Sequence, residues 1–517
     1  MRYAISLLAL LIAACSGGQG ADSPAGSPSG PALAIVTSTL ADGLVSQTYA
    51  ATLQAAGGTQ PYAWAVVAGA LPPGMTLNGQ GDLAGSPASA GSFSFTARVQ
   101  DALGAQADAA FLFTVLASPP AAPMVTAISP TFGLNDRAVP ITLTGTGFTG
   151  ATLVQLNDAA LTPLTNLVVV NSGTLTATIP AEIAPGNWTL RVTTPAGQSA
   201  PSPAYAARNM TDPEAPWAFA VGYMDATMPG ASGDTPAVRI YYPATTAGQN
   251  ATPSALGAPY PCVVYNHGFK PPVLAGGIDY RANTFVAHPL AGLGYVVICI
   301  DQAPNNVLFG SGATAQANSQ RDADDARAAI NYLASLHAGS TSPLSGLLDV
   351  SRVGVAGHSR GGDASLMAAS DERAALGAAA RIRAVAVMGP PSTDSQQSGA
   401  PIQFGNFTAV PALCIGATAD AIAPYSQQLD IFALAGSPSA AFEINGGNHS
   451  QYKDSSTQLT GDSPATISLA TQQEICRRYV VAWFNRHVKG LVVSTAPRLP
   501  GGAVYATDSR IQNRQSK

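Results

Sequence analysis

The spacing of apolar positions changes near residue 209 of this chain. Before that point, short segments in which apolar and polar residues alternate, such as 49–53 and 93–99, are separated by turns. Alternation puts every second side chain on one face of a strand, so this part predicts all-β sandwiches. After residue 209, continuous apolar runs alternate with helical segments. That pattern predicts a mostly parallel sheet with helices on both of its faces.

The strands expected in the second part are seven apolar runs, 238–242, 262–266, 295–300, 353–356, 384–388, 412–415 and 440–444. Between two of these strands we expect a helix over 322–338, whose spacing places on one face Ala326, Ile330, Leu333 and His337. A last helix is expected over 474–488. The chain therefore predicts two β-sandwiches followed by an α/β domain.

Composition and pattern divide the chain into six parts. In chain order these are an export signal (1–14), a flexible Gly-, Ser-, Ala- and Pro-rich tether (15–31), a first sandwich (32–117), a second sandwich behind a Pro-rich spacer (118–207), an α/β catalytic domain (208–490) and a C-terminal tail (491–517).

The first residues have the pattern of an export signal. Arg2 precedes an apolar run over 5–13 that is too short to span a bilayer. The small residues before Cys15 resemble the lipobox of bacterial lipoproteins, which implies removal of the signal and lipidation of Cys15. An ordinary cleaved signal is the alternative. We therefore expect a bacterial envelope lipoprotein at the outer membrane or cell surface, anchored or released.

Charge and cysteine content exclude several classes of function. Only 10% of residues are charged and the net charge is −5, so no basic surface is available for nucleic acid, and membrane contact is expected only through the lipid anchor. Cys262, Cys299 and Cys414 fall in expected strands and Cys476 in the last helix, at spacings that select no disulfide. No cluster has the spacing of metal ligands, and we expect neither a metal nor a cofactor.

The pentapeptide Gly357-His358-Ser359-Arg360-Gly361 directly follows the apolar run 353–356 and precedes a helical stretch. A Gly-x-Ser-x-Gly sequence between a strand and a helix forms a tight turn that raises the serine hydroxyl above the sheet. Ser359 is therefore the predicted nucleophile.

A serine hydroxyl needs an imidazole base and a carboxylate that holds the imidazole, and in this fold the chain order is serine, acid, histidine. His449 and His487 are the histidines downstream of Ser359. His449 lies in a loop after the last expected strand, where catalytic loops gather, whereas His487 lies within a helix. His449 is the predicted base.

Asp420 is the predicted acid because it follows the strand over 412–415, the penultimate strand of the sheet. Asp394, after the preceding strand, is the main alternative. Asp454 is too near the histidine in sequence, and Asp363 lies in the helix after the nucleophile.

Two backbone amides are expected to stabilise the negative charge that develops on the carbonyl oxygen. One belongs to Arg360, and the best candidate for the other is Phe269, in the turn after the strand over 262–266. His267 and His358 are not placed as a triad base and are expected to pack or hydrogen-bond beside the turn.

These segments together resemble the cutinase and poly(ethylene terephthalate) hydrolase branch of the α/β-hydrolases, with dienelactone-hydrolase and platelet-activating-factor-acetylhydrolase relatives. The resemblance covers the last 290 residues or so and rests on His267-Gly268-Phe269, 357–362, 420–424 and 443–450. It implies Ser359 as nucleophile, Asp420 as acid, His449 as base, and Phe269 and Arg360 as the oxyanion hole. The residues we expect to line the substrate pocket are Phe269, His358, Pro390, Pro391 and Ile422.

The chain departs from that branch at three positions. Arg360 stands where methionine often follows the nucleophile, Gly389-Pro390-Pro391 replaces an expected tryptophan, and the cysteine before the acid in the disulfide-bridged members is absent. These departures leave the expectation of an ester hydrolase in place and argue against polyester activity. The segment 302–316 is expected to shape the entrance of the site.

The two sandwiches resemble known immunoglobulin-like modules. Residues 57–101 are similar to modules of bacterial surface proteins, and 128–190 to the IPT/TIG fold. Tyr62 and Trp64 could form a carbohydrate platform, but aromatic residues in a sandwich are more often core. We expect both modules to be spacers or weak binders of carbohydrate or surfaces.

The expected function is cleavage of a small or polymeric carboxylic ester, with short acyl groups favoured, through an acyl-enzyme. Two alternatives stay open. One is a surface adhesion protein with an inactive hydrolase domain, and the other is amide or thioester cleavage by the same three residues.

Overall fold

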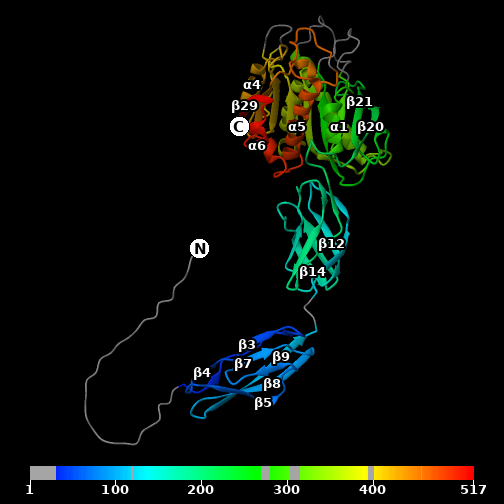
Figure 1. Ribbon diagram of the computed structural model, residues 1–517. Helices are drawn as coiled ribbons and strands as arrows, with labels where there is room; N and C mark the ends of the chain where they lie inside the picture. The colour runs from blue at the N-terminus through cyan, green and yellow to red at the C-terminus, as the bar shows by residue number, and fades with distance from the viewer. Residues whose placement is uncertain (1–30, 118–120, 269–279, 303–314, 394–400, 456) are drawn as a thin grey trace, which may run out of the picture. The chain divides into compact units, whose positions relative to one another are not determined.

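The computed structural model describes residues 31–117, 121–268, 280–302, 315–393, 401–455 and 457–517 (Figure 1). The chain forms two compact units, 1–121 and 122–517. Phe269, Asp394 and Cys15, three residues singled out above, lie outside the described residues, as do the export signal, nearly all of the tether and most of the segment 302–316.

The first unit is a β-sandwich. Its strands are β1 (Ala34–Ile35), β2 (Gly43–Leu44), β3 (Tyr49–Thr52), β4 (Ala55–Ala56), β5 (Ala63–Gly69), β6 (Met75–Leu77), β7 (Asp82–Gly85), β8 (Gly91–Gln100) and β9 (Gln106–Leu116). They pair as β2-β9-β8-β5, β3-β7-β6 and β1-β4. Trp64 is buried in the core with Leu83 and Phe113. The hydroxyl of the partly buried Tyr62 donates to Gly57 O at 2.5 Å. Trp64 is therefore a core residue, the more common role for an aromatic side chain in a sandwich.

The second unit begins with another sandwich. Its strands are β10 (Met124–Ser129), β11 (Phe132–Leu134), β12 (Val139–Thr146), β13 (Leu153–Leu156), β14 (Thr165–Asn171), β15 (Thr174–Ile179), β16 (Gly186–Trp188), β17 (Leu190–Thr194), β18 (Gly197–Gln198) and β19 (Tyr205–Arg208). They form the sheets β10-β12-β15-β14, β11-β19-β16 and β13-β17-β18. In β15 every second residue is buried, which is the alternation that predicts a half-buried strand.

The rest of the second unit is built on a ten-stranded sheet in the order β22-β20-β21-β24-β23-β25-β26-β27-β28-β29. The strands are β20 (Ala220–Thr227), β21 (Ala237–Ala244), β22 (Gly248–Gln249), β23 (Tyr260–Asn266), β24 (Val296–Ile300), β25 (Leu348–His358), β26 (Ile382–Met388), β27 (Ala412–Ala417), β28 (Ser439–Ile444) and β29 (Ile511–Ser516). The six strands from β24 to β28 in this order are parallel, while β20, β21 and β29 add antiparallel edges.

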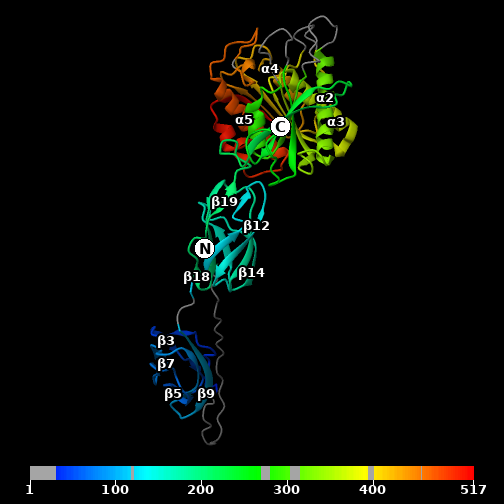
Figure 2. The same cartoon turned by 90° about the vertical axis from the view of Figure 1, so that its right-hand side faces the viewer.

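Helices cover both faces of this sheet, as the sequence predicts. They are α1 (Thr284–Gly292), α2 (Ala315–Ala338), α3 (Arg360–Leu376), α4 (Tyr425–Leu434), α5 (Leu469–His487) and α6 (Ala503–Thr507). The apolar faces of α2, α3 and α4 share one buried core with the sheet, and those of α1 and α5 share the other. Figure 2 shows α2 and α3 lying side by side. Short 3₁₀ turns occur at η2 (Gly377–Ala379), η3 (His449–Gln451) and η4 (Ala496–Arg498).

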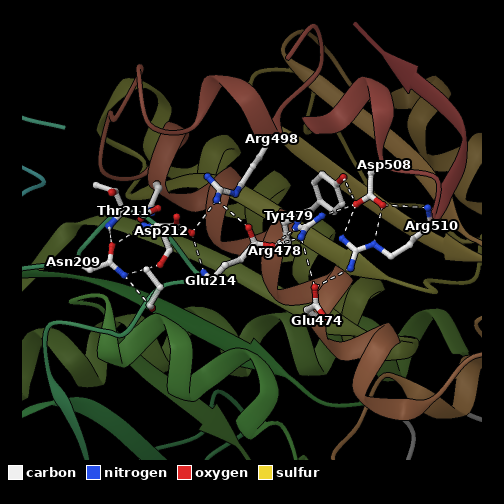
Figure 3. A network of polar contacts seen from close by, with 12 residues as sticks. Asn209, Thr211, Asp212, Glu214, Glu474, Arg478, Tyr479, Arg498, Asp508 and Arg510 are labelled. Atoms are coloured by element: carbon white, nitrogen blue, oxygen red, sulfur yellow. Dashed lines mark hydrogen bonds and ion pairs between the residues drawn. The ribbon is translucent and has the colours of Figure 1, made fainter. Parts of the chain in front are cut away.

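The last 27 residues, which the sequence predicts as a tail, belong to the α/β fold. Strand β29 pairs antiparallel with β28, and α6 packs its Tyr505 against Phe442. Figure 3 shows the polar contacts behind this segment, where the carboxylate of Asp508 accepts hydrogen bonds from Arg478, Tyr479 and Arg510. The sequence does not predict β29, because this edge strand is mostly polar and contains no continuous apolar run.

The second sandwich and the α/β part of this unit are joined by buried polar contacts. The side-chain amide of Asn135 donates to Thr211 Oγ1 at 3.0 Å, and its carbonyl accepts from Met210 N at 2.7 Å. The carboxylate of Glu182 accepts from the backbone N–H groups of Val492 and Ser494 at 2.9 and 2.6 Å.

Within the described ranges, no helix has both the length and the apolar composition needed to cross a bilayer.

Candidate active site

Ser359 lies at the sharp turn between β25 and α3. Its backbone has φ 55° and ψ −130°, a conformation that L-residues adopt only under strain. The residue is partly exposed, and its amide donates to Met388 O at 2.9 Å, at the end of the neighbouring strand β26. The turn therefore holds the serine above the sheet edge, as the Gly-x-Ser-x-Gly sequence predicts.

Two glycines allow this turn to form. A Cβ added to Gly357 would lie 2.1 Å from Gly361 O, and one added to Gly361 would lie 2.2 Å from Asn266 O. Strand β25, helix α3 and strand β23 approach one another too closely at these points for any side chain.

His449 and Asp420 meet at the same edge of the sheet. Nδ1 of His449 lies 2.9 Å from Oδ2 of Asp420, and both side chains are buried. Because an ionised carboxylate only accepts, Nδ1 carries the hydrogen and Nε2 is left to accept a proton. The other oxygen of Asp420 accepts from the backbone N–H groups of Ile422 and Ala423 at 3.0 and 2.7 Å, which fixes the carboxylate.

The strand order explains this meeting. Ser359, Gly389, Asp420 and His449 follow the carboxyl ends of β25, β26, β27 and β28, which are neighbours in the sheet. In open parallel sheets these ends are where sites are built.

Gly389 lies between the predicted acid and base, and sequence reasoning did not give it a role. A Cβ at this position would lie 3.0 Å from Asp420 Oδ2 and 3.1 Å from His449 Nδ1, and its φ is 53°. The only signal in the sequence is that Gly389-Pro390-Pro391 replaces the tryptophan expected from the resemblance. The space that a side chain would need is taken here by the Asp420–His449 pair.

Two further side chains hold the loop that carries His449. Oδ2 of Asp462 accepts from the amide and the hydroxyl of Ser450 at 2.8 and 2.6 Å, and Oδ1 accepts from Ala421 N at 3.3 Å. Asp462 thus connects the residue after His449 with the residue after Asp420. Gln472, on α5, exchanges two hydrogen bonds with the backbone of Asn448, at 2.9 and 2.8 Å. Neither residue was found from the sequence, because nothing in the local pattern marks a loop anchor.

His358 is fully buried beside the predicted base. Its ring centroid lies 4.6 Å from that of His449 and 5.4 Å from that of Tyr452. Burial, with the nearby His449 and Lys453, holds the pKa of His358 well below its usual value, so the ring is neutral. A buried ring does not line an open pocket, so His358 acts as packing behind the site, in accord with its expected place beside the turn.

The side chain of Arg360 points into the protein. Its Nε donates to Oδ2 of Asp322, on α2, at 2.9 Å, and both side chains are at most 9% exposed. Burial raises the pKa of Asp322, against the opposing effect of Arg360. Burial also raises the pKa of Asp363, in the first turn of α3, well above its usual value. The Arg360 side chain is thus held by Asp322, while its backbone amide remains at the turn.

The strand end that leads to Phe269 is anchored through His267. Nε2 of His267 accepts from Gln302 N at 3.0 Å, so Nδ1 carries the hydrogen and donates to Gly268 O at 2.6 Å. Gln302 also donates to Asn266, which in turn donates to Ser365 on α3. This network ties the loop after β23 to the loop after β24 and to helix α3.

The other pocket candidates lie near Asp420. Pro390 is buried, and its Cβ faces Gly362 in the first turn of α3, while Pro391 and Ile422 are partly exposed. The alternatives for the acid and base have other partners. Asp454 accepts from Thr284 N at 2.8 Å and caps α1, and His487 packs on Trp483 with ring centroids 4.3 Å apart.

Cys262, Cys299, Cys414 and Cys476 are buried free thiols. In the ranges that the structure covers, no group of three His, Cys, Asp or Glu side chains is arranged to hold a metal ion.

The sheet, its helices and the Ser359 turn define an α/β-hydrolase. Residues 196–490, more than half of the chain, match the PET hydrolase-like family, and the chain belongs to that family. Residues 31–116 match the He_PIG family of Ig domains, and 123–206 match the IPT/TIG domain. No curated protein is similar enough to count as a relative. The protein is thus a hydrolase-family domain preceded by two immunoglobulin-like modules.

Proposed function

We propose that this protein is a serine hydrolase that cleaves carboxylic esters, with Ser359 as nucleophile, His449 as base and Asp420 as acid. The observation that carries the proposal is the 2.9 Å contact between His449 Nδ1 and Asp420 Oδ2, at the sheet edge that also bears the positive-φ turn of Ser359. The three residues follow β25, β27 and β28, three of four consecutive parallel strands, in the chain order that this fold uses.

In the proposed reaction, Nε2 of His449 takes the hydroxyl proton of Ser359 as Oγ attacks the ester carbonyl carbon. The negative charge on the carbonyl oxygen is stabilised by the backbone N–H of Arg360 and, we propose, by that of Phe269, each worth about 3 kcal/mol. The protonated imidazole, which Asp420 stabilises, then gives its proton to the leaving alcohol as the carbon–oxygen bond breaks.

Water completes the cycle. His449 removes a proton from water, the resulting hydroxide attacks the acyl-enzyme, and the proton returns to Ser359 as the acid product leaves. The buried Asp420, held by two loop amides, keeps the imidazole in the required tautomer throughout.

For the substrate we propose carboxylic esters with short acyl groups. The family description suggests polyesters, but the chain lacks the tryptophan and the cysteine that accompany that activity in similar hydrolases. Gly389 also leaves no room for a larger side chain beside the acid and base.

The test is an assay with p-nitrophenyl esters of increasing acyl length, with a polyester film alongside. We expect turnover of the acetate and butyrate esters, and loss of at least about a thousandfold in Ser359→Ala. Equal rates for the wild type and Ser359→Ala would support the adhesion protein with an inactive domain. Preference for a matched thioester or anilide would assign the same three residues to thioester or amide cleavage.

We also propose that the protein is exported and anchored through a lipid on Cys15. The Ig-like and IPT/TIG modules fit an exported protein. Expression in a bacterial host should place the wild type in the membrane fraction and Cys15→Ala in the soluble envelope fraction. The same distribution for both would overturn the anchor.

A further inference from the structure

A cavity of about 220 Å³ lies where the second sandwich meets the α/β part of the second unit. Asp136 and Arg137 come from the turn between β11 and β12, whereas Arg352 lies in β25 and Lys489 lies two residues beyond the end of α5. Charged side chains from three separate segments therefore converge on one small space.

Lys489 is the buried centre of this group, with its side chain 6% exposed. Its Nζ lies 3.6 Å from Asp136 Oδ2 and 4.6 Å from the ring centroid of Tyr295, and it donates to Leu293 O. The lysine is thus held in place, with its charge only partly balanced by a carboxylate.

The carboxylate of Asp136 is shared between two cations. Nε and Nη2 of Arg137 donate to its two oxygens at 2.8 and 3.3 Å, in addition to the Lys489 contact. Arg352 has its own partner, since its Nε donates to Asp349 at 2.5 Å. Three cations therefore face two carboxylates, which leaves one positive charge without a balancing partner in the described part of the cavity.

The arginines keep unused donors. Hydrogen bonds among the described residues use Nε of Arg352 and both Nε and Nη2 of Arg137. Nη1 of Arg137 and the two terminal nitrogens of Arg352 remain as donors for a ligand. Guanidinium groups bind phosphate oxygens in pairs, and a charge-assisted bond of this kind is about twice as strong as a neutral one.

Burial of the lysine has an electrostatic consequence. Burial first, and then the charges of Arg137 and Arg352, lower the pKa of Lys489 to about 8, while Asp136 raises it. An anion in the cavity would offset this excess of positive charge. A tetrahedral oxyanion is small enough to fit with accompanying water, since one water takes about 30 Å³.

We propose that this cavity binds a phosphate group, held by Arg137, Arg352 and Lys489, and that binding fastens the second sandwich to the hydrolase fold. The residues that hold the phosphate come from both parts. Neither part could therefore unfold or separate without losing its contacts to the bound phosphate. The proposal is independent of the ester hydrolysis proposed above.

Calorimetric titration of the full chain with sodium phosphate, at constant ionic strength set with sodium chloride, tests the site. We expect saturable one-site binding and a higher midpoint of thermal unfolding in phosphate than in chloride. Arg352→Gln should weaken binding by about tenfold or more, because it removes a charged donor from a partly exposed position.

Arg383→Gln is the matched control, because Arg383 lies on the adjacent strand β26, donates to Ser351 O at 3.2 Å and does not line the cavity as the described residues form it. It should leave phosphate affinity unchanged. Equal affinity for phosphate in wild type and Arg352→Gln, or equal stabilisation by chloride, would overturn the proposal.

Two sources of phosphate can be separated. Flotation with phosphatidylcholine vesicles, with and without phosphatidic acid, tests a lipid headgroup, using a Cys15→Ala protein that has no lipid of its own. Binding that requires phosphatidic acid and Arg352 assigns the site to a headgroup. Calorimetric binding without flotation assigns it to free phosphate.

The pH dependence provides a second readout, with sulfate as a probe whose charge is constant. Sulfate affinity should fall between pH 7 and pH 9 as Lys489 loses its proton. Of the groups that face it, Asp136 has a lowered pKa and Arg137 a raised one, and burial raises the pKa of Tyr260 to about 12 and holds that of Tyr295 well above its usual value, so none of these four gains or loses a proton in that range. An affinity that is constant over this range would exclude Lys489 from the site.

Discussion

At the scale of single residues, the candidate site depends on contacts that lie far apart in sequence. Ser359, Asp420 and His449 could be chosen from a motif and from chain order, because the chemistry needs those residue types in that order. Gly389 could not be chosen, because its role depends on how closely the ends of three strands approach. For His358 the sequence predicts a place beside the turn, but no local pattern shows its burial against His449.

Gly389→Ala tests the space between the predicted acid and base. The added Cβ would lie 3.0 Å from Asp420 Oδ2 and 3.1 Å from His449 Nδ1, so the pair must move. We expect kcat on p-nitrophenyl butyrate to fall by about tenfold or more, since small misplacements cost this much.

Gly377→Ala is the control for that variant. Gly377 has nearly the same φ, 56°, and a Cβ there would meet nothing within 4 Å. Both variants carry a backbone cost of about 1 kcal/mol, which urea midpoints measure, but only Gly389→Ala should lose activity. Equal kcat values would show that the position is not constrained by the site.

The burial of His487 affects how the stability of the protein depends on pH. Burial lowers its pKa from 6.5 to about 4, so between these values the unfolded chain binds more protons than the folded one. This group therefore lowers stability as the pH falls below about 6.5.

His487→Gln should lose less stability than the wild type between pH 7.5 and pH 5. After allowance for partial exposure, we expect a difference of about 1 to 2 kcal/mol in the free energy of unfolding. Urea titrations at both pH values measure it, and parallel losses in the two proteins would contradict the assignment.

At the scale of elements, the sequence predicts the seven buried strands well and the edges of the sheet poorly. Buried parallel strands are continuous apolar runs, so β23 to β28 are visible in the pattern, and the seventh predicted run is the antiparallel strand β21. Strands β20 and β29 lie near the edges, and β29 is largely polar. The loop anchors Asp462 and Gln472 were also missed, because hydrogen bonds between loops have no periodicity.

Asp462→Asn tests the connection between the loops that carry Asp420 and His449. In the wild type the two carboxylate oxygens of Asp462 accept hydrogen bonds from Ala421 and from Ser450. Asparagine keeps one oxygen acceptor, replaces the other with an NH₂ group and removes the negative charge. We expect kcat to fall by about tenfold with little change in KM, because the pair would be less well positioned.

Asp454→Asn is the comparison for this variant. Asp454 comes from the same loop region but caps α1, so its loss should cost about 1 kcal/mol of stability with kcat nearly unchanged. A pH profile of kcat should shift for Asp462→Asn alone. If both variants lose activity in proportion to stability, Asp462 has no positioning role.

At the scale of the whole molecule, the chain separates into two units, and the candidate site lies entirely in the second. Residues 122–517 contain the second sandwich, whose Asn135 and Glu182 make buried or backbone hydrogen bonds with the α/β part. The sequence predicts both sandwiches from their alternation, but it cannot reveal these contacts, which join residues more than 70 positions apart.

A chain that begins at residue 122 should therefore keep its activity on soluble esters. We expect kcat/KM on p-nitrophenyl butyrate within about twofold of the full chain, because a separate domain adds little to the core of another. A large loss would show that the first unit contributes to the site.

The central claim is that Ser359 is the group that attacks the ester, and active-site labelling tests it most directly. Wild type and Ser359→Ala would be treated with a fluorophosphonate, and the modified peptide identified by mass spectrometry. The account predicts a single stoichiometric adduct on Ser359, loss of ester hydrolysis in step with labelling, and no adduct in Ser359→Ala. Hydrolysis that persists after full labelling, or an adduct on another residue, would contradict it.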